Sequence, residues 1–525
     1  MKNKMIFILV IFTFVFTFAC LNVNAAEDDG IVISVGTTIF EESLDPVKGG
    51  MDLGFSFTNA ALLKVAPNSK YIGDMAKEWS ISDNALKYTF LLREGIKFSD
   101  GSDFTADDVV FTYETVKANQ AENERVDLTR MASVKAIDSH TVEFTLYEPY
   151  SPFLDMTALL GIVPKKSYDS EAFDHYPIGT GPWRVVQYTT NQQIIVEPNS
   201  HYYEGSASIQ RVTLVYMDSE IALAAAKSGQ LDVVMADPDV AHEKVSGMTM
   251  YPFETIDIRL ISLPVLPEQT IKDPNGNDVT VGNKVTSDVN VRKALFIGID
   301  RQKIINNAFN GIGKPAYGFT DNLIWAYTEM DSDNRKEEAK AILEEAGWVL
   351  GSDGIREKDG VRCEFDVLTT EMYRFHLASA IAEDAVSLGI RINPRMTTWE
   401  EIGSDRHTTP MLLGWGPYNP RVLNTLFNSD LFLKGEFSNV VGYNNPKVDE
   451  FIGRAIGSNS EAEAIKMWKE VQKTTKDDFP YLYIVNMEHC YFVSDALDLS
   501  LGTQIPHPHG HGTSIMCNMK DWTLR

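Results

Sequence analysis

The sequence predicts an α/β protein, because segments rich in β-branched and aromatic residues alternate with segments of helical periodicity along the chain. The chain has 525 residues, 44% of them apolar, which is enough for two or three hydrophobic cores. It contains no heptad pattern, low-complexity tract or tandem repeat. We therefore expect two or three compact α/β units.

The first twenty residues have the layout of a secretory signal peptide. Lys2 and Lys4 precede an apolar run that ends at Cys20 in "TFAC". We interpret residues 1–19 as the signal and 20–30 as a tether with a lipid on Cys20, whereas cleavage after Ala25 in "VNA" is the alternative. The expected location is the outer face of the cytoplasmic membrane as a lipoprotein, or the periplasm if the chain is cleaved after Ala25.

The acidic balance of the chain argues against nucleic acid as a partner. The formal net charge is −26, and removal of the signal with its two lysines leaves 45 basic and 73 acidic residues. Besides Cys20 there are Cys363, Cys490 and Cys517, with no CxxC spacing. At most one disulfide can form among them, and no zinc ribbon is expected.

The predicted elements follow from local patterns. The β-rich runs, in chain order, are 30–37, 87–92, 140–147, 193–198, 211–217 and 482–487. The helical runs are 219–229, 334–347, 375–389 and 460–475, and several open on Ser or Asn and close on Gly, as capping requires. The loop 272–284, "KDPNGNDVTVGNK", has the composition of a hairpin or linker, and we place a domain boundary near it.

Two short motifs have a structural explanation. In "FSDGSDFTADDV", Thr105 is expected to cap a helix whose first turn carries Asp107 and Asp108, where the helix dipole favours acids. In "GTGPW", Gly179 and Gly181 are expected to permit a sharp reversal of the chain. We interpret both as scaffold features.

Five stretches together resemble one family. They are 88–114, 176–188 ("YPIGTGPWRVVQY"), 228–234 ("SGQLDVV"), 289–305 ("VNVRKALFIGIDRQKII") and 339–348 ("AKAILEEAGW"). In this order they resemble the extracytoplasmic solute-binding proteins of ABC importers, family 5, which take up oligopeptides, dipeptides and nickel chelates. The resemblance runs from about residue 30 to the C-terminus.

The resemblance implies a two-lobed periplasmic-binding-protein fold of type II, in the large cluster that carries an extra domain, with the solute in a cleft between the lobes. The first lobe would comprise 31–60, 185–284 and 499–525, the extra domain 61–184, and the second lobe 285–498. A solute that contacts both lobes only when they close shifts the population toward the closed form. A monomer that docks on a membrane permease with ATPase subunits is expected.

The segment 414–429, "GWGPYNPRVLNTLFNS", bears on the solute. In peptide-binding relatives the corresponding segment supplies an aspartate that pairs with the ammonium of the bound peptide. Here no acid precedes Asp430, and a buried unpaired ammonium is costly. The resemblance therefore implies that a peptide lacks its usual anchor.

The same segment resembles the nickel-binding branch, whose pattern is Trp-Gly-x-Pro-Tyr-Asp-Pro, here one residue shorter. By that match Trp415 and Tyr418 would line the cleft, the alternative being an aromatic pair in the lobe core. Arg421 is expected to pair with a chelator carboxylate, or else to lie on the surface. Arg125 or Arg130 corresponds loosely to a chelator-binding arginine of the branch.

The C-terminal stretch "QIPHPHGHG" offers candidate metal ligands. In an extended strand His507, His509 and His511 would point to one side, and imidazole is a common ligand for nickel. The alternative is a polar loop, because prolines and glycines interrupt the segment. We expect a structural role for His489 and a structural or surface role for the remaining histidines, His140, His175, His201, His242, His376 and His407.

The sequence thus predicts a binding protein without enzymatic activity or intrinsic cofactor, whose solute is Ni²⁺, alone or with a small chelator. Capture of a di- or oligopeptide is the alternative. A secreted metallohydrolase is a remote alternative, because only Asp521 follows His511 as an acid and no GxSxG, Walker, HExxH or GxGxxG motif occurs.

Overall fold

The computed structural model describes residues 30–36, 43–49, 57–123, 125–320, 322–329, 332–509 and 513–525. Cys20 with its predicted signal and tether, and the third histidine, His511, lie outside these residues. Within these ranges no helix is long and apolar enough to cross a membrane. Cys363, Cys490 and Cys517 are all free thiols.

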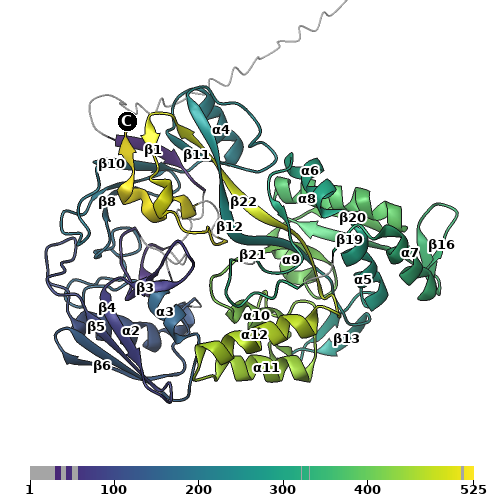
Figure 1. Ribbon diagram of the computed structural model, residues 1–525, viewed down its shortest axis with the longest axis horizontal. Coiled ribbons are helices and arrows are strands. Elements are labelled where there is room, and N and C mark those ends of the chain that lie inside the picture. Colours follow the sequence, from purple (N-terminus) through teal and green to yellow (C-terminus); the bar gives the residue numbers. More distant parts are fainter. Residues whose placement is uncertain are drawn as a thin grey trace, which may run out of the picture.

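One long mixed sheet joins both lobes, which confirms the predicted α/β class (Figure 1). Strands β1 and β10, β1 and β11, and β19 and β20 pair in parallel, as expected where helices cross between strands. In spatial order the sheet contains β20 (Arg391–Met396), β19 (Glu364–Thr369), β21 (Met411–Trp415), β12 (Met248–Ser262), β22 (Tyr481–Ser494), β11 (Val233–Ala236), β1 (Gly30–Ser34), β10 (Arg211–Val215), β9 (Gln193–Pro198) and β8 (Trp183–Thr189), and β15 (Lys314–Pro315) pairs with β22.

Strands β12 and β22 form a ribbon that connects the two lobes, called here the hinge ribbon. They pair antiparallel along most of their length, with a shift of register between Glu254 and Ile258. On one side of this shift β22 pairs with β11 of the first lobe, and on the other side β12 pairs with β21 of the second lobe. The chain therefore crosses between the lobes at the register shift.

The extra domain has its own sheet and core, and lies at the lower left of Figure 1. The Thr105 backbone N–H donates to Asp108 (2.8 Å), so the predicted helix begins as expected. Its elements are the hairpin β2 (Leu63–Val65) and β3 (Tyr71–Gly73), the sheet β4 (Ala76–Ile81), β5 (Lys87–Leu92), β7 (Thr141–Leu146) and β6 (Met131–Asp138), and helices α2 (Ala106–Ala118) and α3 (Phe153–Leu159).

The predicted helices are present and end as the glycines indicated. Gly229, Gly347 and Gly389 follow helical segments with φ of 75°, 88° and 80°, which glycine adopts without strain. The first lobe carries α4 (Ser219–Lys227). The second carries α5 (Val289–Gly298), α6 (Arg301–Phe309), α7 (Lys336–Glu345), α8 (Met372–Ala385), α9 (Trp399–Asp405), α10 (Arg421–Phe427), α11 (Pro446–Ile456) and α12 (Glu461–Thr475).

Three small β units complete the fold. The predicted hairpin at 272–284 is β13 (Gln269–Lys272) with β14 (Asp278–Val281). The others are β16 (Val349–Leu350), β17 (Arg356–Lys358) and β18 (Val361–Arg362), and β23 (Leu497–Asp498) with β24 (Thr523–Leu524). The proposed boundary beside the hairpin, and the other domain bounds, stay predictions, because both lobes share one sheet.

The end of the chain packs against its beginning. After β22 the chain runs through short 3₁₀ turns, including η6 (Thr513–Asp521), and buries its apolar side chains with Ile31 and Ile33 of β1. This C-terminal contribution consists of Leu497, Leu499, Ile515, Met516, Met519 and Trp522. Residues on both sides of the predicted histidine segment thereby belong to the core of the first lobe.

Gly179 and Gly181 are required for a reason that differs from the predicted one. Neither has a positive φ. Instead, a Cβ atom on Gly179 would lie 2.6 Å from Cγ of Asn59, and one on Gly181 would lie 2.7 Å from the carbonyl oxygen of Thr58. Close approach of two backbone segments, rather than a tight turn, excludes a side chain here.

Candidate functional site

A cavity of about 460 Å³, called here the Trp415 cavity, brings together most of the predicted binding residues. Trp415 ends β21, Tyr418 lies in the turn that follows, and Arg421 begins α10, whereas Arg125 comes from the extra domain and His509 from the C-terminal segment. Pro508, Asn419 and apolar residues of the extra domain complete the wall. The cavity thus lies where three distant parts of the sequence meet.

The lining of the Trp415 cavity is basic. Arg125, Arg421 and His509 line it, and none of its described lining residues is an aspartate or glutamate. Arg421 forms an ion pair of 3.3 Å with Asp127 of the extra domain, which is not part of the lining. The described lining therefore offers guanidinium groups and no carboxylate of its own, and a solute would share Arg421 with Asp127.

Trp415 lies between two glycines that let three segments converge. A Cβ atom on Gly414 would lie 2.5 Å from Nη1 of Arg259 and 2.7 Å from Cε1 of His509, and one on Gly416 would lie 2.7 Å from Cα of Asp257. The Gly-Trp-Gly sequence thus allows the hinge ribbon and the C-terminal segment to pack directly on β21. Trp415 Nε1 is buried and has no hydrogen-bond acceptor among the residues that the structure describes.

Tyr418 joins the second lobe to the C-terminal segment. Its hydroxyl donates to the carbonyl oxygen of Pro506, and its own carbonyl oxygen accepts from Nε1 of Trp325 (2.7 Å). Burial holds the pKa of the Tyr418 hydroxyl well above its usual range, so it stays a hydrogen-bond donor. Trp415 and Tyr418 also pack partly against the second-lobe core. The pair therefore both lines the cavity and contacts the core, which were the two alternatives from the sequence.

His509 enters the Trp415 cavity from a fixed position. Its backbone N–H donates to the carbonyl oxygen of Gly416 (3.0 Å), and its Nδ1 lies 2.9 Å from a carboxylate oxygen of Asp257. Its side chain is 23% exposed. An imidazole that donates from Nδ1 to a carboxylate carries its lone pair on Nε2, which is the arrangement seen behind metal-binding histidines.

His507 and Arg130 lie elsewhere. His507 is fully buried, and its ring stacks on Phe253 with 5.0 Å between ring centres. Burial holds the pKa of His507 well below its usual range, so its imidazole is neutral. Arg130 pairs with Glu148 (2.7 Å) and covers the ring of Tyr150. Neither residue belongs to the lining of the Trp415 cavity.

His507 and His509 therefore have different surroundings, because the first is buried against Phe253 and the second lines the Trp415 cavity. The C-terminal segment pairs with β12 at His507, through a bridge to Thr255, and then hydrogen-bonds to β21 at His509. Because the segment changes its partner from β12 to β21, the His507 ring lies in the core and the His509 ring lines the cavity. Within the described ranges, no group of three or more His, Cys, Asp or Glu side chains could hold a metal ion.

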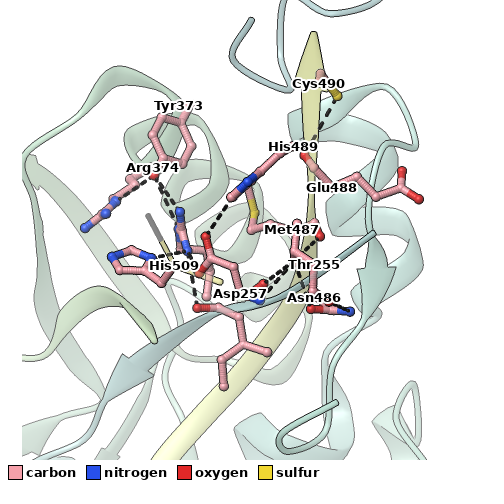
Figure 2. A network of polar contacts seen from close by, with 12 residues as sticks. Thr255, Asp257, Tyr373, Arg374, Asn486, Met487, Glu488, His489, Cys490 and His509 are labelled. Atoms are coloured by element: carbon pink, nitrogen blue, oxygen red, sulfur yellow. Dashed lines mark hydrogen bonds and ion pairs between the residues drawn. The ribbon is translucent and has the colours of Figure 1, made fainter. Parts of the chain in front are cut away.

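The sequence analysis missed a buried charge network in the hinge ribbon, shown in Figure 2. Asp257 is 1% exposed and contacts Nη1 of Arg259, Nδ1 of His509 and Nε2 of His489, the last at 3.2 Å. Arg259 also donates to the hydroxyl of Tyr373 (2.9 Å). The sequence pattern that could have indicated this network is "TIDIRLIS", in which an aspartate and an arginine alternate with isoleucines. Charges buried in a strand need partners, so this pattern predicts a charge network.

A second cavity, of about 640 Å³, lies between the lobes and is called here the acidic cavity. It is lined by the ends of first-lobe strands, by second-lobe residues near α8 and α9, and by Asp257, Arg259 and His489 of the hinge ribbon. Its other carboxylates are Asp218, Asp237, Glu371 and Glu488. Burial, together with the charges of Asp239 and Glu371, raises the pKa of Asp237 to about 6.

Comparison with known proteins identifies the family of the chain. Residues 70–431 match the model of bacterial extracellular solute-binding proteins, family 5 middle. Protein XP55 of Streptomyces lividans is 32% identical over 441 residues, which cover 81% of this chain and 77% of that protein. The oligopeptide-binding protein AppA of Bacillus subtilis is 28% identical over 429 residues, covering 77% of this chain and 76% of AppA.

A solved structure supports the two-lobed fold. NikZ from Campylobacter jejuni in complex with Ni(L-His) superposes with a TM-score of 0.79 at 23% sequence identity, covering 95% of this chain and 100% of that chain. The predicted two-lobed periplasmic-binding-protein fold is confirmed. At this level of identity the likeness concerns the fold and leaves the solute to be argued from the cavity.

Proposed function

We propose that this chain, which belongs to the bacterial extracellular solute-binding proteins of family 5, captures a nickel chelate and delivers it to the permease of an ABC importer. The proposed solute is Ni²⁺ held by a small carboxylate-bearing chelator, and the proposed site is the Trp415 cavity. The observation that carries the proposal is the lining, which combines two arginines, a histidine and three aromatic side chains with no carboxylate among its described residues.

The polar groups of the lining suit an anionic solute. Guanidinium groups bind carboxylates through paired hydrogen bonds, and two of them line the cavity, Arg125 from the extra domain and Arg421 from α10. The buried indole N–H of Trp415 is a further donor that a carboxylate oxygen would satisfy. The proposed role of each residue is to bind the chelator rather than the metal.

The metal would bring most of its ligands into the site. Since no cluster of three metal-binding side chains occurs among the described residues, we assign a single imidazole, that of His509, to the metal. The chelator would supply the remaining ligands. Arg130 and His507 are not assigned a role in binding, because neither lines the cavity.

A peptide is the alternative solute, and one relative is named as an oligopeptide-binding protein. The ammonium of a peptide would enter a cavity whose nearest charged groups are arginines, and a buried ammonium without a carboxylate costs several kcal/mol. The absence of acids from the described lining therefore favours the chelate. Binding of a peptide would require an anchor outside this lining.

Contacts between the extra domain and the second lobe support a clamp that closes over the cavity. Arg421 pairs with Asp127, the Ser151 hydroxyl donates to the carbonyl oxygen of Ala455 (2.8 Å), and the Ser151 N–H donates to that of Ile456 (2.9 Å). A solute between Arg125 and Arg421 would add contacts only while these surfaces are together. Its differential affinity for the closed form would then drive closure.

The family is extracellular by description, which supports export of this chain. We further propose that Cys20 carries the lipid that keeps the protein at the membrane. In a bacterial host, Cys20→Ala should move the protein from the membrane fraction to the soluble exported fraction. Retention of the variant in the membrane fraction would contradict lipid anchoring.

The function is tested by isothermal titration of the mature protein with Ni²⁺ alone, Ni²⁺ with free histidine, Ni²⁺ with a small tricarboxylate, each chelator without metal, and a peptide mixture. We expect the tightest binding for one of the nickel chelates, weaker binding for its free chelator, and none for the peptides. Arg130→Ala is the matched control for Arg125→Ala, because both residues lie in one loop and only Arg125 lines the cavity. Binding of peptides but of no chelate would overturn the proposal.

A further inference from the structure

We propose that Asp257 is a positioning residue for solute binding, which holds the His509 ring in the Trp415 cavity and ties it to the hinge ribbon. The inference rests on the proposed role of His509 as the protein ligand of the metal. Asp257 itself does not line the Trp415 cavity, so any effect of this carboxylate on the solute there must pass through its neighbours.

The geometry that carries the inference is the convergence of three side chains on one carboxylate (Figure 2). One oxygen of Asp257 lies 2.9 Å from Nδ1 of His509 and contacts Arg259, and the other lies 3.2 Å from Nε2 of His489. All four side chains are at least three-quarters buried. Water is therefore a poor competitor for these hydrogen bonds, and the His509 ring is held in one orientation.

The charge of the network fixes which nitrogen of His509 carries the hydrogen. Arg259 contacts the Asp257 carboxylate and is the counter-charge beside it in the buried ribbon. An ionised carboxylate only accepts hydrogen bonds, so Nδ1 of His509 donates across the 2.9 Å contact, and Nε2 is the nitrogen that can offer a lone pair to a metal. An amide in place of the carboxylate could donate instead, and the lone pair would no longer be assigned to one nitrogen.

The position of Asp257 in β12 connects His509 to lobe closure. Asp257 lies within the register shift where the hinge ribbon crosses between the lobes, and its backbone N–H donates to the hydroxyl of Thr255 (2.9 Å). That hydroxyl in turn donates to the carbonyl oxygen of Met487 on β22 (2.6 Å). A change in the angle of the ribbon would therefore move Asp257, and with it His509, relative to Trp415.

The first test needs no solute. In the mature protein labelled with ¹⁵N-histidine, His509 is assigned as the signals lost in His509→Ala. We expect shifts of the Nδ1–H tautomer in the wild type and a changed tautomer distribution in Asp257→Asn, whereas Asp366→Asn, a surface control on β19, leaves the signals in place. Unchanged His509 shifts in Asp257→Asn would overturn the inference, whatever solute the protein binds.

The second test measures affinity for the nickel–histidine complex in a double-mutant cycle. Asp257→Asn should weaken binding about 10- to 100-fold, as loss of a partner behind a metal ligand does. In a His509→Ala background the same change should alter affinity by less than about 2-fold, because Asp257 acts through that ring. An equal loss in both backgrounds would show a general structural effect and refute positioning.

Asp257→Asn leaves the Arg259 charge buried and could prevent folding. Two further variants cover that outcome. Asp257→Asn with Arg259→Gln removes both charges together. Gly414→Ala keeps both charges and crowds His509 and Arg259, since its Cβ atom would lie 2.7 Å from Cε1 of His509 and 2.5 Å from Nη1 of Arg259. Both should change the His509 shifts and weaken chelate binding. If the wild type binds no nickel chelate, the proposed function fails, and the tautomer experiment still decides the role of Asp257.

Discussion

The Trp415 cavity and the acidic cavity are linked through Asp257, which lines the second and contacts His509 of the first, yet their linings have opposite charge. The first presents Arg125, Arg421 and His509, whereas the second presents four carboxylates beside an arginine that Asp257 already neutralises. A two-lobed fold supplies space between lobes, but the side chains decide which charge enters each space. An anion is expected in the first cavity and is disfavoured in the second.

The comparison also shows why the fold alone leaves the solute open. The framework of the Trp415 cavity, with Gly414 and Gly416 packed against the hinge ribbon, is independent of what binds there. The charged groups that discriminate between solutes lie in the loop after α2, at the start of α10 and in the C-terminal segment, outside the strands of the sheet. Relatives with the same fold can therefore bind different solutes.

The largest effect is expected from removal of both arginines. Arg125→Ala combined with Arg421→Ala should weaken chelate binding more than about 100-fold, because a hydrogen bond to a charged group contributes about 1.5 to 3 kcal/mol. Arg130→Ala is the control and should leave affinity within about 2-fold. Titration calorimetry on the wild type, the double variant and the control measures these affinities. A loss of similar size in Arg130→Ala would contradict the claim that Arg125, and not Arg130, contacts the solute.

A smaller effect is expected from placing a carboxylate in the basic cavity. Asn419→Asp adds one negative charge to the lining and should lower the affinity for an anionic chelate about 10-fold, since like charges in a partly buried site repel by about 1 to 2 kcal/mol. The same variant should gain affinity for peptides through their ammonium group. Competition between a nickel chelate and a dipeptide measures both changes. Tighter binding of the chelate by this variant would contradict a positively charged lining.

Substitution in the acidic cavity should affect stability rather than affinity. The pKa of Asp237 is raised to about 6, so the folded state binds its proton more tightly than the unfolded chain does. This group therefore stabilises the fold below about pH 4, its ordinary pKa, and that contribution is lost as the pH rises through about 6. Asp237→Asn should flatten the fall in the free energy of unfolding over this interval, measured by urea denaturation, and change chelate affinity by less than about 2-fold.

The smallest effect on affinity is expected at His507. Its pKa is held well below the usual value, so the unfolded chain takes up a proton below about pH 6.5 that the folded state does not, and stability is lost as the pH falls. His507→Phe keeps a ring on Phe253 and should reduce this loss in acid denaturation while leaving chelate affinity within about 2-fold. A large loss of nickel binding in this variant would indicate that His507 is a metal ligand, contrary to the assignment made here.

Local patterns in the sequence were sufficient for the elements but not for their neighbours. The ends of α4 and α7 at glycines and the strand at 87–92 could be predicted, because each depends on residues close in sequence. Trp415, Tyr418 and the arginine of the loop after α2 were predicted from the family resemblance. His507 and His509 look equivalent in sequence, and only tertiary contacts separate them.

Asp257 shows what sequence reasoning could not reach. The pattern of "TIDIRLIS" places a charged pair in an apolar strand, but the partner His509 lies 252 residues further along the chain. No spacing rule connects residues at that separation. The carboxylate becomes part of a site only when β12, β21 and the C-terminal segment pack together.

The most direct test of the central claim is a crystal structure of the protein with the best-binding nickel chelate, with anomalous scattering measured at the nickel absorption edge. We predict one strong peak in the Trp415 cavity, about 2 Å from an imidazole nitrogen of His509, with chelator carboxylates on Arg125 and Arg421. A peak in the acidic cavity, or a peptide in the Trp415 cavity with its ammonium held by another group, would contradict the account.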